Sequence, residues 1–298
     1  MSDLYIAGVL SRFESFKRTG LIRAEPRVRP RAWLENFEEH EQFAAAALLD
    51  TFVYYSDEMT SKLLRASYTN LLDEARGLGA EAAVRSAYVA PIEGEDPNVS
   101  DSGNMFCRKA RYELGIHEDR LLPTGEALEA ALGGASVILI DDFMGSGEQL
   151  VKTWKRRYRS TSPRSFEEAA SQCDVDVTAL LLVSTEDGYK RARFECLGLR
   201  VLAGHVLGED YSVRRITELP QIPDDADHPD LQNEIHQLLA RVAPELVLKE
   251  YMRRSDFALY GFQSFGLSVA FQHGTPDAML PVFWAEGPPD WTPLVRPA

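Results

Sequence analysis

The sequence predicts an α/β protein with a parallel sheet, preceded by a helical region and followed by a C-terminal tail. Apolar runs recur at residues 137–140, 175–183 and 199–206, and helical patterns separate them. Continuous apolar runs are typical of strands covered on both faces, as in parallel sheets. Because parallel neighbours need a long crossover, we expect these runs to share one sheet.

The first 84 residues are expected to form an N-terminal helical region. Residues 1–20 and 33–78 carry apolar residues at helical spacing, and prolines interrupt the chain between the two stretches. Ser56 or Asp57 is expected to begin a second helix inside the longer stretch. The predicted division is therefore a helical region at 1–84 and an α/β domain with its C-terminal extension at 85–298.

The α/β domain is expected to alternate strands and helices. The predicted strands are 86–92, 137–140, 175–183, 199–206 and 267–271. The predicted helices are 104–114, 147–159, 187–197 and 230–243.

Composition and charge limit the possible partners. The 298 residues include 46 acidic and 32 basic side chains, which gives a net charge of −14. This excess argues against broad nonspecific binding to nucleic acid or to anionic membranes. No stretch reaches the roughly 18 apolar residues of a membrane span, and the first residues are too polar for a secretory signal. We expect a cytoplasmic protein.

One segment, VILIDDFMGSGEQ at residues 137–149, carries most of the chemistry. Asp141 and Asp142 follow the apolar run, where open α/β sheets place their ligands. Gly145, Ser146 and Gly147 allow a sharp turn, and the following helix presents free N–H groups that favour an anion. Acids beside such a turn suit a ribose phosphate. The alternative is an ordinary strand–helix junction in which Asp142 or Ser146 caps the helix.

This segment resembles the ligand loop of type I phosphoribosyltransferases, which bind phosphoribosyl pyrophosphate. The resemblance implies that Asp141 and Asp142 hold the ribose hydroxyls as catalytic residues, with Mg²⁺ beside them, so both are candidate metal ligands. It also implies that the loop wraps the 5′-phosphate. The loop residues are Phe143, Met144, Gly145, Ser146, Gly147, Glu148 and Gln149.

Two positions depart from the family pattern. Gln149 stands where the family commonly has Thr or Ser, which removes one phosphate hydroxyl contact. Gly145 stands where purine-salvage members carry an acidic general base, so a purine-salvage reaction is not expected. Other phosphate motifs fit less well, because no Lys follows the glycines as in a P-loop and Leu150 replaces the third Rossmann glycine.

The segment SDSG at 100–103 matches the family less closely. In phosphoribosyltransferases the first core strand leads into a loop that meets pyrophosphate, which would place Ser102, Gly103 and Lys109 on the pyrophosphate side. An ordinary capped helix with a solvated basic face explains the same residues.

The closing segment, with LYGFQ and HGTPDAMLPVFW, resembles a branch of phosphoribosyltransferase-like proteins (the PRTase-CE type) linked to bacterial conflict and antiphage defence. The WLENF and DDFMGSGEQ segments resemble it too. The resemblance implies that His273 and Thr275 lie near the ribose site as a hood. The alternative is a simple turn before the tail.

Three functions follow as hypotheses. The first is a phosphoribosyltransferase, or a nucleotide-cleaving relative, that acts at the anomeric carbon of a phosphoribosyl or nucleotide ligand with Mg²⁺ and serves as an antiphage effector. The second is an inactive sensor of the same ligands. The third is an interaction module whose N-terminal helical layer and basic helix, with KTWKRRYR at 152–159, dock a protein or nucleic-acid partner, such as a defence-system protein or a ribonucleoprotein.

Overall fold

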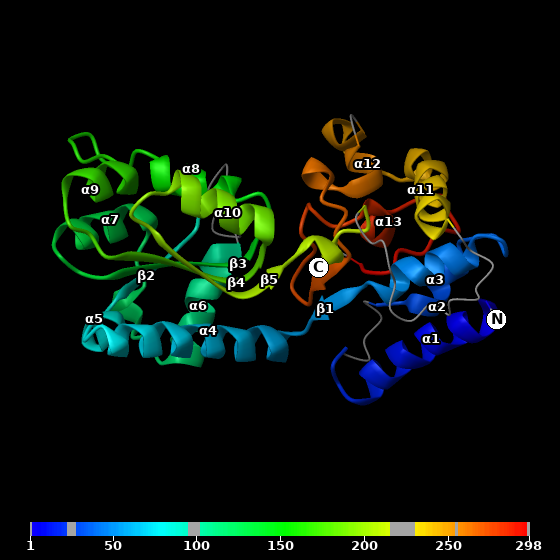
Figure 1. The fold of residues 1–298 in the computed structure, drawn as a ribbon, viewed down its shortest axis with the longest axis horizontal. Helices are drawn as coiled ribbons and strands as arrows, with labels where there is room; N and C mark the ends of the chain where they lie inside the picture. Colours follow the sequence, from blue (N-terminus) through cyan, green and yellow to red (C-terminus); the bar gives the residue numbers. More distant parts are fainter. Residues whose placement is uncertain (1, 23–27, 95–101, 215–229, 254–255, 297–298) are drawn as a thin grey trace. The chain divides into compact units, whose positions relative to one another are not determined.

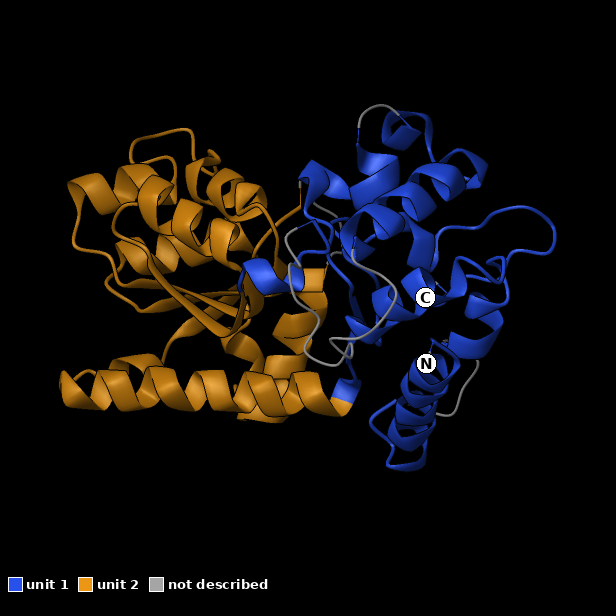
Figure 2. Cartoon of the chain, turned by 45° about the vertical axis from the view of Figure 1, so that its right-hand side comes forward, with its two compact units in different colours: residues 1–57, 208–298 blue, residues 58–207 orange. Residues whose placement is uncertain are grey.

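The computed structural model describes residues 2–22, 28–94, 102–214, 230–253 and 256–296. The chain forms two compact units, and each is described by itself. Unit 1 combines residues 1–57 with 208–298, and unit 2 is the continuous segment 58–207 (Figure 2).

A four-stranded parallel sheet forms the centre of unit 2, as the sequence predicts. Its strand order is β2-β3-β4-β5 (Figure 1). The strands are β2 Tyr88–Pro91, β3 Val137–Met144, β4 Val177–Thr185 and β5 Arg200–Leu207. All nine residues of β4 are buried, which explains the unbroken apolar run in this strand.

Helices cover both faces of this sheet. Along the chain they are α4 Asp57–Gly77, α5 Glu81–Arg85, α6 Ser102–Leu114, the short 3₁₀ helix η1 Glu118–Arg120, α7 Thr124–Leu132, α8 Glu148–Lys155, α9 Phe166–Gln172 and α10 Glu186–Glu195. Residues of α7, α8, α9 and α10 share one apolar cluster with the sheet. Helices α4 and α6 lie on the other side of the strands in Figure 1. The core is therefore a three-layer α/β sandwich.

Helix α8 ends earlier than the predicted 147–159. It stops at Lys155, and Arg156 is extended at φ −63° and ψ 138°. The Arg156 guanidinium bonds the Glu93 carboxylate at 2.5 Å and the Gly94 carbonyl oxygen at 2.9 Å, both beyond β2. These long-range contacts explain why the basic segment leaves the helix.

Unit 1 is built from the two outer parts of the chain. Its elements before unit 2 are α1 Ser2–Arg18, α2 Pro30–Leu34, α3 Gln42–Asp50 and β1 Val53–Tyr55. Those after unit 2 are η2 Glu209–Tyr211, α11 Leu231–Val242, η3 Ala243–Glu245, η4 Glu250–Arg253, α12 Phe257–Tyr260, η5 Phe262–Ser264, β6 Val269–Phe271 and α13 Pro281–Trp284. Both sets share one apolar core that includes Phe13, Trp33, Leu239 and Phe283.

The two sets are also joined through β1, a strand inside a stretch that the sequence marks as helical. It pairs in parallel with β6, with Val53 opposite Val269. The expected division at residues 84 and 85 differs from the two units, because residues 58–84 pack with the sheet. Leu63 and Ser67 of α4, for example, lie against Gly204 of β5.

No helix in the described ranges combines the length and the apolar character that membrane crossing requires.

Candidate ribose-phosphate site

The two predicted acids lie inside β3 rather than just after it. Pairing with β4 continues to Met144, opposite Ser184, so the strand extends past both carboxylates. Asp141 is 2% exposed and Asp142 is 7% exposed. The sequence predicts the acids at the carboxyl end of the strand, and the structure places them in its buried second half.

The start of α6 contacts the first acid directly. The Ser102 hydroxyl donates to Asp141 Oδ1 over 2.6 Å, and the Asp142 backbone N–H donates to the same oxygen over 2.9 Å. Gly103 packs so closely on the end of β2 that a Cβ there would lie 2.7 Å from the Ile92 carbonyl oxygen. This close packing brings Ser102 to the acids.

The electrostatics of the acid pair are unfavourable for full charge. Burial, the charge of Asp142 and a hydrogen bond with the Asp142 side chain raise the pKa of Asp141 well above its ordinary value. The Ser102 hydroxyl and the Asp142 amide lower the same pKa, but they do not outweigh burial. A bound cation or hydroxyl donors would stabilise the charged form of the pair.

A tight turn connects the acids to α8. Gly147 occupies the left-handed region at φ +74° and precedes the first helical residue, Glu148. The Ser146 side-chain oxygen accepts from the Glu148 N–H at 3.3 Å within this turn. The N-cap residue of α8 is Gly147, which makes no side-chain capping bond, so neither Asp142 nor Ser146 takes the capping position of the alternative interpretation.

The other loop residues differ in exposure. Met144 is buried in the apolar cluster, whereas Phe143 is half-buried. Glu148 pairs with Lys152 at 2.9 Å along the helix, and Gln149 is exposed. The predicted loop is thus one continuous strand–turn–helix segment.

The segment 137–149 gives no indication that the end of the next strand, β4, also contacts this turn. Thr185, at the end of β4, donates its hydroxyl hydrogen to the Gly145 carbonyl oxygen at 2.6 Å. The polar residues that follow the apolar run 175–183 could have indicated this contact, because neighbouring parallel strands end at the same edge of a sheet.

The other residues predicted near the site are placed less directly. The Lys109 ammonium donates to the Thr60 hydroxyl at 2.8 Å, two turns of α6 beyond Ser102. Ser100 and Asp101 lie outside the described residues. His273 and Thr275 belong to unit 1, so their predicted place as a hood stays a prediction.

The basic segment is largely engaged within the chain. Lys155 pairs with Glu195 at 3.1 Å, and Arg156 pairs with Glu93. Arg157 is exposed. These pairs leave the segment with less net charge than its sequence suggests.

No group of three or more His, Cys, Asp or Glu side chains in the described part of the chain is arranged to hold a metal ion. Mg²⁺ commonly takes one or two carboxylates and completes its shell with water and ligand phosphates. The Asp141 and Asp142 pair fits that mode.

Buried acids, a glycine turn and a helix start at one edge of a parallel sheet define a phosphoribosyltransferase-like α/β protein. The PRTase-CE family model matches residues 30–296, and the chain belongs to this family. Among solved structures, orotate phosphoribosyltransferase from Aeropyrum pernix is similar at 22% identity and a TM-score of 0.25, over 47% of this chain and 71% of that one. The curated proteins include no match.

Proposed function

We propose that the protein binds a phosphoribosyl ligand, phosphoribosyl pyrophosphate or a nucleotide, at the turn from Asp141 to Gln149. The observation that carries this proposal is the buried acid pair directly before a left-handed glycine turn and a helix start. Carboxylates accept hydrogen bonds from ribose hydroxyls, and a helix start favours phosphate.

The backbone of the turn supports a phosphate contact. Because a trans peptide places its N–H opposite its C=O, the bond between Thr185 and the Gly145 carbonyl turns the Ser146 N–H away from β4. The first N–H groups of α8 add to this donor set. An anion there needs no side-chain cation.

Asp141 and Asp142 would also hold Mg²⁺ together with oxygens of the ligand. When bound, Mg²⁺ would supply charge that stabilises a departing pyrophosphate. Burial and Asp142 raise the pKa of Asp141, so a bound cation would have to offset this cost to keep the carboxylate charged.

The reaction we propose takes place at the anomeric carbon. The bond from C1 to the leaving group breaks, its electron pair leaves with that group, and an acceptor lone pair forms the new bond. The acids orient the ribose, while the turn fixes the 5′-phosphate. Gly145 offers no side chain as a base, so the acceptor would have to react without a base from this position.

The experiment is calorimetry of the full chain with phosphoribosyl pyrophosphate and Mg²⁺. We expect saturable heat in the wild type and none in the Asp141→Asn, Asp142→Asn double variant. The matched control is Asp73→Asn, Glu74→Gln, which neutralises two adjacent acids on the exposed side of α4. Absence of binding in the wild type would overturn the proposal.

A non-catalytic sensor is the second candidate, and Gly145 favours it because a purine-salvage base is missing there. The two candidates differ in turnover. Release of pyrophosphate from the bound ligand, in the presence of candidate acceptors and of water, supports the enzyme. Tight binding with no release supports the sensor.

We also propose that the protein acts in the bacterial cytoplasm as an antiphage effector, together with a defence-system protein or a ribonucleoprotein. Membership in the PRTase-CE family and the likeness of the closing segment to that branch support this role. Plaque counts on a host that carries the gene with its neighbours test it. Protection should require Asp141 and Asp142, and equal plaque counts with and without the gene would contradict the role.

A further inference from the structure

The start of α10 packs directly against the turn that we propose to hold phosphate. The Thr185 hydroxyl donates to the Gly145 carbonyl oxygen at 2.6 Å and accepts from the Gly188 N–H at 2.9 Å. Thr185 is 4% exposed, so water competes little for either bond. One buried hydroxyl therefore caps α10 and also holds the turn between β3 and α8.

The backbones of the two segments also approach unusually closely. A Cβ added to Gly188 would lie 2.1 Å from the Gly145 carbonyl oxygen, and one added to Gly147 would lie 2.9 Å from the Gly188 carbonyl oxygen. Two facing glycines allow this approach. On the same side, Arg191 Nη1 donates to the Ser146 carbonyl oxygen at 3.4 Å.

We propose that Thr185 is a positioning residue for the phosphate turn. Its hydroxyl holds the Gly145 carbonyl toward α10, which directs the Ser146 N–H to the opposite side, where the 5-phosphate of the ligand would accept it. This inference rests on the proposed function for the ligand. The geometry of the turn follows from the contacts of Thr185, Gly188 and Arg191 and needs no ligand.

The test combines hydrogen exchange with ligand binding in the full chain. Thr185→Val removes the hydroxyl at similar volume, and Thr185→Ser retains it. The matched control is Ser165→Ala, since Ser165 caps α9 by accepting from the Glu168 N–H at 3.1 Å and does so away from the turn. Exchange is followed in the peptide 141–150, and the ligands are phosphoribosyl pyrophosphate and ribose 5-phosphate.

We expect Thr185→Val to exchange faster in this peptide and to bind both ligands about tenfold more weakly, by the same factor because both carry the 5-phosphate. Thr185→Ser and Ser165→Ala should stay near the wild type in both measurements. Unchanged exchange or unchanged affinity in Thr185→Val would overturn the inference.

The two proposals fail in different ways. If the wild type binds neither ligand, the proposed function fails. Faster exchange confined to Thr185→Val would still support the positioning of the turn, and unchanged exchange would overturn it.

Discussion

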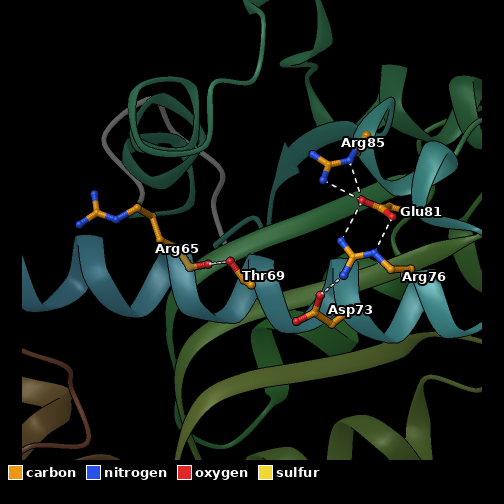
Figure 3. A network of polar contacts seen from close by, with 6 residues as sticks. All are labelled: Arg65, Thr69, Asp73, Arg76, Glu81 and Arg85. Carbon is orange, nitrogen blue, oxygen red and sulfur yellow. Dashed lines mark hydrogen bonds and ion pairs between the residues drawn. The ribbon is translucent and has the colours of Figure 1, made fainter.

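Two connections in unit 2 are held by polar contacts of opposite kinds. At the junction of α4 and α5, the half-buried Glu81 carboxylate accepts from two exposed arginines, from Arg76 Nε at 2.8 Å and from Arg85 Nη2 at 2.7 Å (Figure 3). Asp73 adds a bond from Arg76 at 2.6 Å. At the turn from β3 to α8, two carboxylates are buried and bond one another, and Asp141 also accepts from a hydroxyl and a backbone amide.

The pKa values record this difference. Hydrogen bonds from the two arginines lower the pKa of Glu81 to about 2, whereas burial and Asp142 raise the pKa of Asp141. The charge of Glu81 is already balanced by the two arginines within the chain. Burial and Asp142 dominate the electrostatics of Asp141, so a cation brought by a ligand would stabilise the charged form of this carboxyl. The comparison therefore separates a solvent-screened ion-pair cluster from the proposed ligand site.

The largest effect is expected at Gly188, where the backbone of α10 meets the turn between β3 and α8. Gly188→Ala should lower the free energy of unfolding by about 1–3 kcal/mol, because its Cβ would overlap the Gly145 carbonyl oxygen. Chemical denaturation measures this change. Gly208→Ala is the control, since nothing lies within 4 Å of a Cβ there.

The ion pair of Arg156 with Glu93 is intermediate in burial between the Glu81 cluster and the acid pair. The Arg156 side chain is 24% exposed and the Glu93 side chain is 18% exposed. Arg156→Ala should lower the free energy of unfolding by about 1–2 kcal/mol, because the half-buried Glu93 loses a charged donor. Denaturation of Lys155→Ala provides the comparison, as the Lys155 pair is more exposed. Equal losses in both variants would contradict the ranking.

Asp141→Asn is expected to raise stability while it abolishes ligand binding. The amide removes a buried charge, and the gain should be about 0.5–2 kcal/mol near neutral pH. Because folding raises the pKa of Asp141 above its ordinary 3.8, the wild-type chain loses stability as the pH rises above that value. The gain should thus shrink toward pH 3.8, and thermal unfolding across pH tests this. A lower Tm at pH 7 would contradict it.

The smallest effect is expected at Glu81. Glu81→Gln should lower Tm only slightly, because its partners Arg76 and Arg85 are exposed and solvent screens such ion pairs. Folding lowers the pKa of Glu81 from 4.5 to about 2, so the wild-type advantage is present above pH 4.5 and disappears as the pH falls toward 2. Ligand affinity should stay unchanged, and a loss of affinity would remove the distinction between the two connections.

Local patterns predicted the sheet and the acid turn. The apolar runs and the segment 137–149 carry their own signals, since burial on both faces and a tight turn each need particular residues in sequence. Strands β4 and β5 therefore lie within about two residues of their predicted ranges, whereas β3 begins at the predicted Val137 and continues to Met144 instead of ending at Ile140. The family membership was also indicated by the loop and the closing segment, and the family model confirms it.

Contacts between distant residues were not predictable in the same way. Strand β1 has three residues and pairs with β6, more than 200 positions later. The apolar spacing of the residues around it is helical, so the sequence predicts a helix there. The early end of α8 depends on Glu93, and the Thr185 bond spans 40 positions. Each of these contacts forms only when the tertiary fold brings its two residues together, so no local sequence pattern indicates it.

The pairing of β1 with β6 has a consequence for biosynthesis. Residues 53–55 leave the ribosome long before residues 269–271 exist, while unit 2 is a continuous segment between them. Contacts of high sequence separation form slowly, and domains fold as units during synthesis. Unit 2 can therefore fold while the first half of unit 1 still exposes apolar surface. Until residues 208–298 are synthesised, the apolar residues of 1–57 lack part of the core that they share in the folded chain.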